Sequence, residues 1–349
     1  MEISENLKIT VGIITYDRPE FLKEAVNSVL QQSFRNFELI ISNDNVDVDI
    51  SFETLGIKND ARIKIVNQAT NLGVLNNMNY LLGIAKGEWF VWLSEDDLLH
   101  PEFLKLAYNV ILKNQKKNIV GFFSNYMSVP SPCGVFPAPL KSNACLVDSA
   151  SSSVANFLID YSSRKYPLVG ECGLMHVGTL KKIGGIPKLG SGPGHYSDTL
   201  LPILLIEHGS ICWLDDYLVF FRASPDSISH NSTDFFAYTS AEADFLKNIR
   251  RVCASQTVNM RPDKVIANMV KWFALLEWQV LSRSPSLSKY SALVKFIKYQ
   301  LNENLPKLAF KYKINHITFL ITRLTVIIYK KLHLALKTKL TIKPKSVTR

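Results

Sequence analysis

A short acidic segment is the part of the sequence best suited to chemistry. Glu95, Asp96 and Asp97 follow an apolar run from Trp89 to Leu93 and precede Pro101, where a helical pattern begins. Adjacent carboxylates repel each other unless a positive charge lies beside them. Oxygen ligands suit Mg²⁺ or Mn²⁺, which complete their coordination with waters and substrate phosphates. The segment therefore predicts a divalent-metal site, although an exposed acidic turn that caps the next helix would have the same pattern.

Two other β-branched runs also end in polar clusters. Residues 8–14 are followed by Thr15-Tyr16-Asp17, and residues 37–42 are followed by Asn43-Asp44-Asn45. Open α/β sheets bind ligands at the carboxyl ends of their parallel strands. We therefore expect these two clusters and the acidic segment to lie at one edge of a sheet.

The elements that would position these clusters alternate between strand and helix. Apolar runs predict buried strands at 8–14, 37–42, 62–66, 89–93 and 118–123. Between them, helical spacing predicts helices that begin near Pro19, with Asp17 as a candidate N-cap, and at 74–85 and 101–112. This alternation predicts a doubly wound α/β sheet.

The stretch from Ile9 to Pro101 resembles glycosyltransferase family 2 along nearly its whole length. The matching pieces, in order, are TYDRPEFLKEAVNSVLQQSFRNFELIISNDN, NLGVLNNMN and AKGEWFVWLSEDD. The resemblance implies a GT-A fold, an α/β domain with a Rossmann-like, mixed and mostly parallel sheet flanked by helices. Its first half would hold a nucleoside diphosphate sugar and its second half the acceptor.

The resemblance also implies roles for single residues of the first half. Asp44 would bond the nucleotide base with Thr15 beside it, Asp96 would face the ribose and sugar, and Asp97 would hold Mn²⁺ or Mg²⁺ on the diphosphate. Asp96 is the second candidate metal ligand, and Asn79 is a further candidate for the donor site. The chain departs from the family pattern at Asn43, Asn45, Val46, Met78 and Ser94.

The second half contains a candidate catalytic base. Asp198 opens a helical pattern and, by the resemblance, would remove the proton of the acceptor hydroxyl in an inverting transfer. The alternative is that Asp198 only caps its helix. His195 and Arg222 could approach the diphosphate and stabilise the leaving charge. Alternatively, His195 is a solvent-exposed loop residue and Arg222 pairs with Asp215 or Asp216.

The positive charge of the chain is concentrated at its C-terminal end. The net charge is +10, and residues 289–349 hold fourteen Lys and Arg against the single acid Glu303. Apolar residues from Ile317 to Leu332 recur at helical spacing, without an uncharged run long enough to span a bilayer. This tail could lie on an anionic membrane surface, or it could pack on its own core or another subunit.

These patterns divide the chain near residue 232. Residues 1–232 would form the GT-A domain, with a nucleotide-sugar half at about 8–100 and an acceptor half at 101–232, and residues 233–349 a helical basic extension. Five cysteines without C-x-x-C spacing argue against a disulfide framework or zinc knuckle. The N-terminus lacks a signal-peptide pattern, so we expect a cytoplasmic protein, with the tail allowing peripheral attachment to the inner face of the cell membrane.

The function expected from this sequence is inverting sugar transfer to a saccharide or lipid-linked saccharide, as in bacterial surface polysaccharide synthesis, without nucleic acid as a partner. Nucleotidyl transfer is an alternative, but it would favour a Gly-rich basic loop after the first strand, where Thr15 to Pro19 contains no glycine. A non-catalytic nucleotide-sugar-binding module is a further alternative. The joint presence of Asp44, Asp96, Asp97 and Asp198 argues against it.

Overall fold

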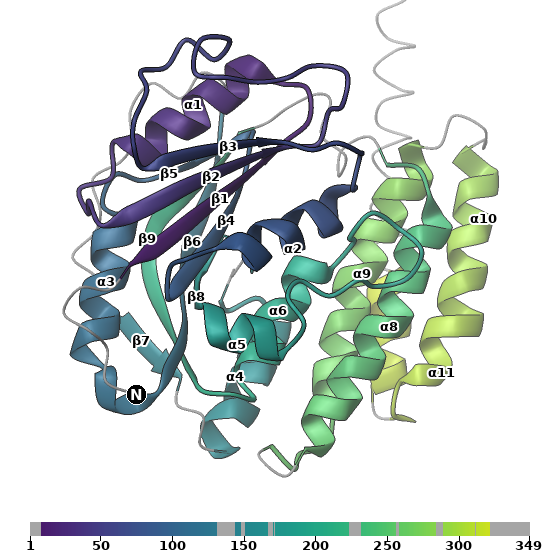
Figure 1. Ribbon diagram of the computed structural model, residues 1–349. Helices are drawn as coiled ribbons and strands as arrows, with labels where there is room; N and C mark the ends of the chain where they lie inside the picture. Colours follow the sequence, from purple (N-terminus) through teal and green to yellow (C-terminus); the bar gives the residue numbers. More distant parts are fainter. Residues whose placement is uncertain are drawn as a thin grey trace, which may run out of the picture. The chain divides into compact units, whose positions relative to one another are not determined.

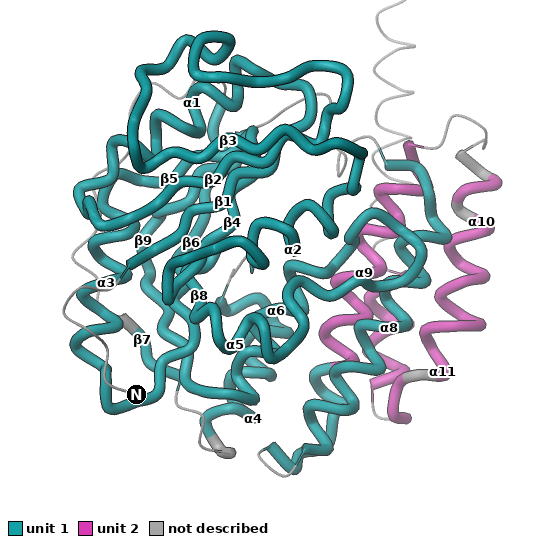
Figure 2. The backbone as a smooth tube through the Cα atoms, viewed as in Figure 1, with its two compact units in different colours: residues 1–265 teal, residues 266–349 magenta. Residues whose placement is uncertain are grey.

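The computed structural model describes residues 8–130, 144–147, 151–166, 170, 172–222, 232–255, 258–283, 289–310 and 312–321. It divides into two compact units, residues 1–265 and 266–349 (Figure 2). The first unit contains a nine-stranded mixed sheet with its helices, and the second contains helices (Figure 1).

The sheet has the strand order β3-β2-β1-β4-β8-β6-β9-β5, and β7 pairs with β9. The neighbours β3, β2, β1 and β4 are parallel, as are β6 and β9, whereas β8, β5 and β7 run antiparallel to their neighbours. The strands are β1 (Ile9–Thr15), β2 (Phe37–Asn43), β3 (Ile63–Asn67), β4 (Trp89–Ser94), β5 (Asp97–Leu99), β6 (Ile119–Val129), β7 (Ala144–Val147), β8 (Leu174–His176) and β9 (Ser210–Arg222). The predicted mixed, mostly parallel sheet is confirmed.

Helices cover both faces of the parallel strands because alternate side chains of a strand point to opposite faces. Helices α1 (Pro19–Leu30) and α3 (Phe103–Lys113) bury apolar stripes in the same core as Val11 and Ile13 of β1. On the other face, α2 (Val74–Ile84) lies over β1 and β4, where the Trp92 indole donates to Met78 O at 2.8 Å. This arrangement fixes the C-terminal ends of β1, β2 and β4 as one edge.

The predicted strands and helices of the first hundred residues agree with the structure to within two residues at each end. Helix α1 begins at Pro19 as expected, but its N-cap is Arg18 rather than Asp17, and no side chain caps it. The sequence patterns missed β5, β7 and helix α4 (Ser151–Ser162). β5 and β7 are too short to show a period, and α4 begins in a Ser-rich stretch that is typical of a loop.

The acceptor half adds α5 (Val177–Lys182) and α6 (Ser197–Leu205). Helix α8 (Phe235–Ala254) belongs to the same compact unit, and the division between the two units falls after residue 265, later than the boundary near 232 expected from the sequence. The reason is local contact with the glycine-rich segment before α6. Gly190 N donates to Asp244 Oδ2 at 2.9 Å, and Ser191 N donates to Ser240 Oγ at 3.1 Å.

The second unit contains most of α9 (Asp263–Arg283), then α10 (Lys289–Tyr299), a π-helical turn (Gln300–Asn304), α11 (Leu305–Lys307) and a helix at residues 312–321. The predicted helical extension is present, and its expected continuation to Lys339 lies outside the described residues. Within the part that the structure describes, no helix has the length and apolarity needed to span a membrane.

Candidate active site

Three strand ends meet at the edge where the sequence predicts the site. In the strand registers, Thr15 of β1 pairs with Asn43 of β2, and Ile14 pairs with Ser94 of β4. The chain then continues into Asp44 on one side and Glu95 on the other, and Asp44 N donates to Thr15 O at 2.9 Å. The predicted adjacency of Thr15 and Asp44 is therefore present in the structure.

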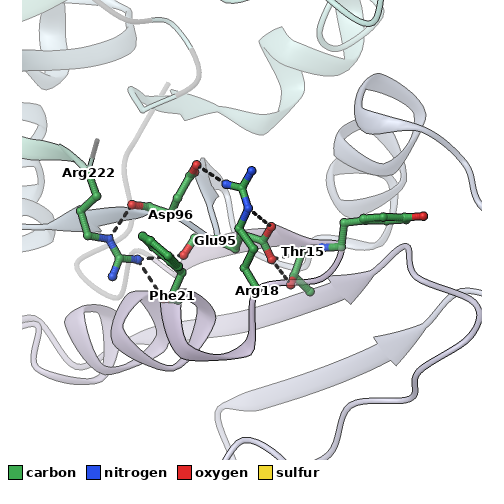
Figure 3. Close-up of polar contacts among 7 residues, drawn as sticks. Thr15, Arg18, Phe21, Glu95, Asp96 and Arg222 are labelled. Atoms are coloured by element: carbon green, nitrogen blue, oxygen red, sulfur yellow. Dashed lines mark hydrogen bonds and ion pairs between the residues drawn. The ribbon is translucent and has the colours of Figure 1, made fainter. Parts of the chain in front are cut away.

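Glu95, directly after β4, forms hydrogen bonds to the C-terminal end of β1 and so joins the two strand ends (Figure 3). Its Oε2 accepts a hydrogen bond from the Thr15 hydroxyl and another, at 3.1 Å, from Tyr16 N. Burial raises the pKa of the Glu95 carboxyl, and these two bonds partly oppose that rise because they favour the charged form. The Thr15 hydroxyl is thus engaged with protein, and Glu95 fixes the loop after β1 against the acidic segment.

Arg18 supplies the positive charge that three consecutive acids require. Its Nη1 lies 2.7 Å from Asp96 Oδ2, and its Nε lies 3.9 Å from Glu95 Oε1 (Figure 3). The Arg18 side chain is 22% exposed and that of Asp96 is 20% exposed, so solvent reaches this pair from the open side of the edge. A ligand that approaches Asp96 must therefore meet the Arg18 guanidinium as well.

Arg222 lies behind the acidic segment and holds its backbone (Figure 3). Its Nε donates to Asp96 O at 2.5 Å, and its Nη2 donates to Glu95 O at 2.9 Å and to Phe21 O at 2.8 Å. Its Nη1 pairs with Glu24 Oε2 at 2.7 Å, and the side chain is fully buried. Burial lowers the Arg222 pKa, while the carboxylates of Glu24, Asp97 and Asp96 raise it.

These contacts differ from both alternatives expected from the sequence, in which Arg222 approaches the diphosphate or pairs with Asp215 or Asp216. The guanidinium points at backbone carbonyls rather than toward the open edge, and its carboxylate partner is Glu24 rather than Asp215 or Asp216. Asp215 instead accepts from Asn125 Nδ2 at 2.5 Å. Arg222 therefore positions the turn that presents Asp96 and Asp97.

Asp97 begins β5 and is 6% exposed. β5 pairs antiparallel with β9, with Asp97 opposite Phe221, so the strand that ends in Arg222 also fixes the backbone of Asp97. Among the residues that the structure describes, no group of three or more His, Cys, Asp and Glu side chains could hold a metal ion. One or two carboxylates beside a substrate diphosphate are the donor set that Mg²⁺ and Mn²⁺ use in such sites, and Asp97 with Asp96 fits it.

Asp44 and Asn79 both hold backbone segments around the edge. Asp44 is 5% exposed, and its two carboxylate oxygens accept from Leu72 N at 2.7 Å and from Gly73 N at 2.8 Å. Asn79 exchanges two hydrogen bonds with the backbone of Ile186, at 2.9 and 3.1 Å. The Asn79 amide thus joins α2 to the segment after α5. We expected this side chain at the donor edge, and its hydrogen bonds are instead with Ile186.

The second cluster of polar groups surrounds Asp198, in the first turn of α6. Burial raises the pKa of the Asp198 carboxyl, while hydrogen bonds from the backbone and side chain of Thr199, and then the Arg164 guanidinium, oppose that rise. The Tyr161 hydroxyl donates to Thr199 O at 2.8 Å, and Arg164 Nη2 lies 3.4 Å from the Tyr126 hydroxyl. A half-buried carboxylate with a raised pKa, close to a cation, is a suitable proton acceptor.

His195 precedes this helix and packs on α8. Its ring stacks on Tyr238 with centroids 3.7 Å apart. Burial lowers the His195 pKa, which disfavours the positive charge that the sequence suggested. Its Nε2 has no hydrogen-bond partner within the described part of the chain, so this atom could still form a hydrogen bond to a ligand.

Sequence reasoning missed four residues of these clusters: Tyr16, Arg18, Glu95 as the link between two strand ends, and Arg164. Tyr16 lies next to Thr15 with 55% of its surface exposed, which is unusual for a large aromatic side chain. The signal for Arg18 was its place in the same segment as Thr15, since three acids at one strand end need a nearby cation. Arg164 has a positive φ of 65°, which no feature of the sequence indicates.

Comparison with known proteins finds a family match within the first unit. Residues 10–134 match the model of glycosyl transferase family 2. An Escherichia coli UDP-Glc:alpha-D-GlcNAc-diphosphoundecaprenol beta-1,3-glucosyltransferase, WfgD, is 27% identical over 135 residues, which are 38% of this chain and 52% of that protein. The chain spans about half or less of the length of the curated relatives it matches.

Solved structures with the same fold cover most of the chain. Staphylococcus aureus TarS residues 1–349 in complex with UDP-GlcNAc matches with a TM-score of 0.52 and 18% identity, over 89% of this chain and 79% of that one. Mannosyltransferase PcManGT from Pyrobaculum calidifontis, in complex with GDP-Man and Mn²⁺, matches with a TM-score of 0.50 and 14% identity, over 93% and 87% of the two chains. Residues 10–134 thus match glycosyl transferase family 2, and the first unit has the GT-A fold.

Proposed function

We propose that this protein transfers a sugar from a nucleoside diphosphate sugar to an acceptor hydroxyl. The observation that carries the proposal is the convergence of Thr15, Asp44 and the acidic segment at one edge, held by Glu95 and Arg222. A structural acidic turn would not need a buried arginine behind its backbone and a second arginine on its open side. The arrangement presents carboxylates at a fixed position where a charged ligand can arrive.

The nucleotide base would lie over Tyr16, beside Asp44. The exposed Tyr16 ring offers an aromatic face for stacking, and Asp44 lies at the end of the neighbouring strand. The relatives support a nucleotide donor in general, since TarS was solved with UDP-GlcNAc and PcManGT with GDP-Man. They differ in base and sugar, so the proposal extends to the nucleoside diphosphate sugar class and names no single donor.

A divalent cation would be held by Asp97, with Asp96 as the second carboxylate. Mg²⁺ or Mn²⁺ would stabilise the negative charge of the departing diphosphate when bound. The chain's own contribution is to hold Asp97 in β5 and to keep Asp96 beside Arg18 until a ligand arrives. We propose that Arg18 then turns from Asp96 toward the diphosphate, because the ligand brings the stronger negative charge.

Asp198 would be the catalytic base. The acceptor hydroxyl gives its proton to the Asp198 carboxylate while its oxygen bonds to the anomeric carbon, and the bond from that carbon to the diphosphate oxygen breaks with its electron pair. Attack opposite the leaving group inverts the anomeric configuration. Asp198 is the described carboxylate that combines a helix N-terminal position in the second half with a pKa raised by burial.

The acceptor would be a saccharide or a lipid-linked saccharide of the bacterial cell surface. This part of the proposal rests on the relative WfgD, whose name gives a diphosphoundecaprenol-linked acceptor. The Arg164 guanidinium acts electrostatically on Asp198 and lies 3.4 Å from the Tyr126 hydroxyl, so both side chains could bond the sugar or phosphate groups of such a molecule.

The test is the release of nucleoside diphosphate from a panel of UDP-, GDP- and dTDP-sugars, with and without Mn²⁺ and with crude lipid-linked acceptor. Metal-dependent release from one donor, stimulated by acceptor, supports the proposal. Nucleotide binding without release from any donor would indicate a binding module, and release of pyrophosphate from a nucleoside triphosphate and a sugar phosphate would indicate a nucleotidyltransferase.

A further inference from the structure

The helix at residues 312–321 in the second unit carries an apolar face that solvent reaches. Ile314, Ile317 and Ile321 are 63%, 39% and 58% exposed, and Phe310, one turn earlier, is 81% exposed. Their spacing of four, three and four residues places them on one side of a helix. Single exposed apolar side chains are ordinary on protein surfaces, but a row of four marks a face that binds something.

The opposite side of this helix is fixed by a buried polar network. His316 and Leu320 are 0% and 7% exposed, and His316 Nε2 lies 3.1 Å from Gln300 Oε1. Gln300 Nε2 in turn donates to Glu277 Oε2 at 2.9 Å. Because a buried amide and imidazole that lose their partners are costly, this network sets the rotation of the helix about its axis. The four apolar residues cannot turn inward without bringing His316 out.

The charge of the second unit indicates what would cover this face. Residues 266–349 contain sixteen Lys and Arg against two acids, Glu277 and Glu303, a net charge of +14. One of those acids, Glu277, is fully buried in the network described above. The last 28 residues, 322–349, contain eight Lys and Arg and no acid. Residues 1–265, by contrast, carry a net charge of −4.

An apolar row in a unit with so high a net positive charge matches an anionic lipid surface. Apolar side chains enter the boundary between head groups and acyl chains, while lysines and arginines stay at the phosphates. A second copy of the chain would bring another +14 to the same place, so charge repulsion disfavours self-association through this face.

We propose that the face formed by Phe310, Ile314, Ile317 and Ile321 lies on the surface of an anionic bilayer, to which the net positive charge of the second unit adds electrostatic attraction. This interaction is independent of the proposed sugar transfer. If both hold, the enzyme is kept at the surface where a lipid-linked acceptor is found.

The test is co-sedimentation of the full chain with vesicles of phosphatidylcholine alone or mixed with phosphatidylglycerol. The variant Ile314→Gln/Ile317→Gln/Ile321→Gln replaces three of the four apolar residues, all but Phe310, without touching the inner side of the helix. The matched control is Asn315→Gln/Thr318→Gln, which changes exposed polar residues of the same helix. Circular dichroism checks that all three proteins retain their helix content.

We expect the wild type and the control to bind mixed vesicles, to bind neutral vesicles weakly, and to be released by salt. The triple variant should bind roughly tenfold less or worse, since apolar insertion and charge both contribute. Unchanged binding by the triple variant, or equal binding to neutral vesicles, would overturn the proposal. A second result would also overturn it: light scattering shows that the wild type is a dimer, the triple substitution dissociates that dimer, and the wild type does not bind vesicles. Nucleoside diphosphate release is measured without lipid on the same proteins. A failure of the proposed sugar transfer is then distinguished from a failure of the proposed membrane binding.

Discussion

Replacement of Arg222 by methionine tests whether this side chain is a structural clamp or a ligand for the diphosphate. Methionine keeps the length and apolar stem, but it removes the donors to Phe21 O, Glu95 O and Asp96 O. Each buried carbonyl left without a donor costs about 1–3 kcal/mol, and water that enters the gap recovers part of this. The charge partner adds little, because the Glu24 side chain is 39% exposed. We therefore expect the free energy of unfolding to fall by about 3–5 kcal/mol.

The assay is guanidinium chloride unfolding, with hydrogen exchange measured by mass spectrometry to localise the effect. Exchange should accelerate in α1 and in the segment around Asp97, which the clamp joins. Arg222→Lys keeps the charge but not the fork of donors, so most of the loss should remain. Glu24→Gln is the control and should cost less than about 1 kcal/mol. Wild-type stability in Arg222→Met, together with lost binding of nucleoside diphosphate, would refute this reasoning and return Arg222 to the donor site.

Three further predictions concern the base. Asp198→Asn should reduce turnover by roughly 10²–10⁴-fold with unchanged donor affinity, as measured by steady-state kinetics and titration calorimetry; an equal fall in affinity would make Asp198 a binding or structural residue. Because burial raises the Asp198 pKa and only the deprotonated form accepts a proton, kcat should fall as the pH falls, with a midpoint above the 3.8 of an unperturbed aspartate. Arg164→Asn, which tolerates the positive φ of 65°, should move that midpoint to higher pH, and an unmoved midpoint would show that Arg164 does not act on Asp198.

The first half of the fold was predictable from sequence because its signals are local. Parallel strands buried on both faces appear as continuous apolar runs, and Pro19 fixes the start of α1. The positions of Thr15, Asp44, Asp96 and Asp97 follow from the same pattern, since each lies at the end of a parallel strand or within three residues after it. Their convergence at one edge then follows from the parallel pairing of β2, β1 and β4.

The partners of several side chains were not predictable, because they come from residues far apart in the chain. Arg222 contacts the acidic segment and α1 only because β5 pairs with β9. Asn79 contacts Ile186 because α2 lies against the segment after α5, more than a hundred residues later. Neither pairing leaves a period or a motif in the sequence. Arg222 and Asn79 were therefore assigned to the donor site because their residue types suit a ligand.

The division between the two compact units falls later in the chain than the change of sequence pattern, for a related reason. The sequence changes from mixed to helical patterns near residue 232, and a change of pattern is a poor guide to which core a helix joins. Tyr238, Ser240 and Asp244 of α8 contact the loop that contains Gly190 and His195, so α8 belongs with the sheet. Contacts rather than secondary structure type decide this boundary.

The most direct test of the central claim is the position of Mn²⁺ in crystals grown with a nucleoside diphosphate, measured by anomalous diffraction at the manganese edge. The account predicts an anomalous peak beside the Asp97 carboxylate, with the diphosphate on the other side of the ion and the base next to Tyr16 and Asp44. The peak should be absent in Asp97→Asn crystals under the same conditions. A nucleotide bound at this edge with manganese elsewhere, or a nucleotide bound away from the ends of β1, β2 and β4, would contradict it.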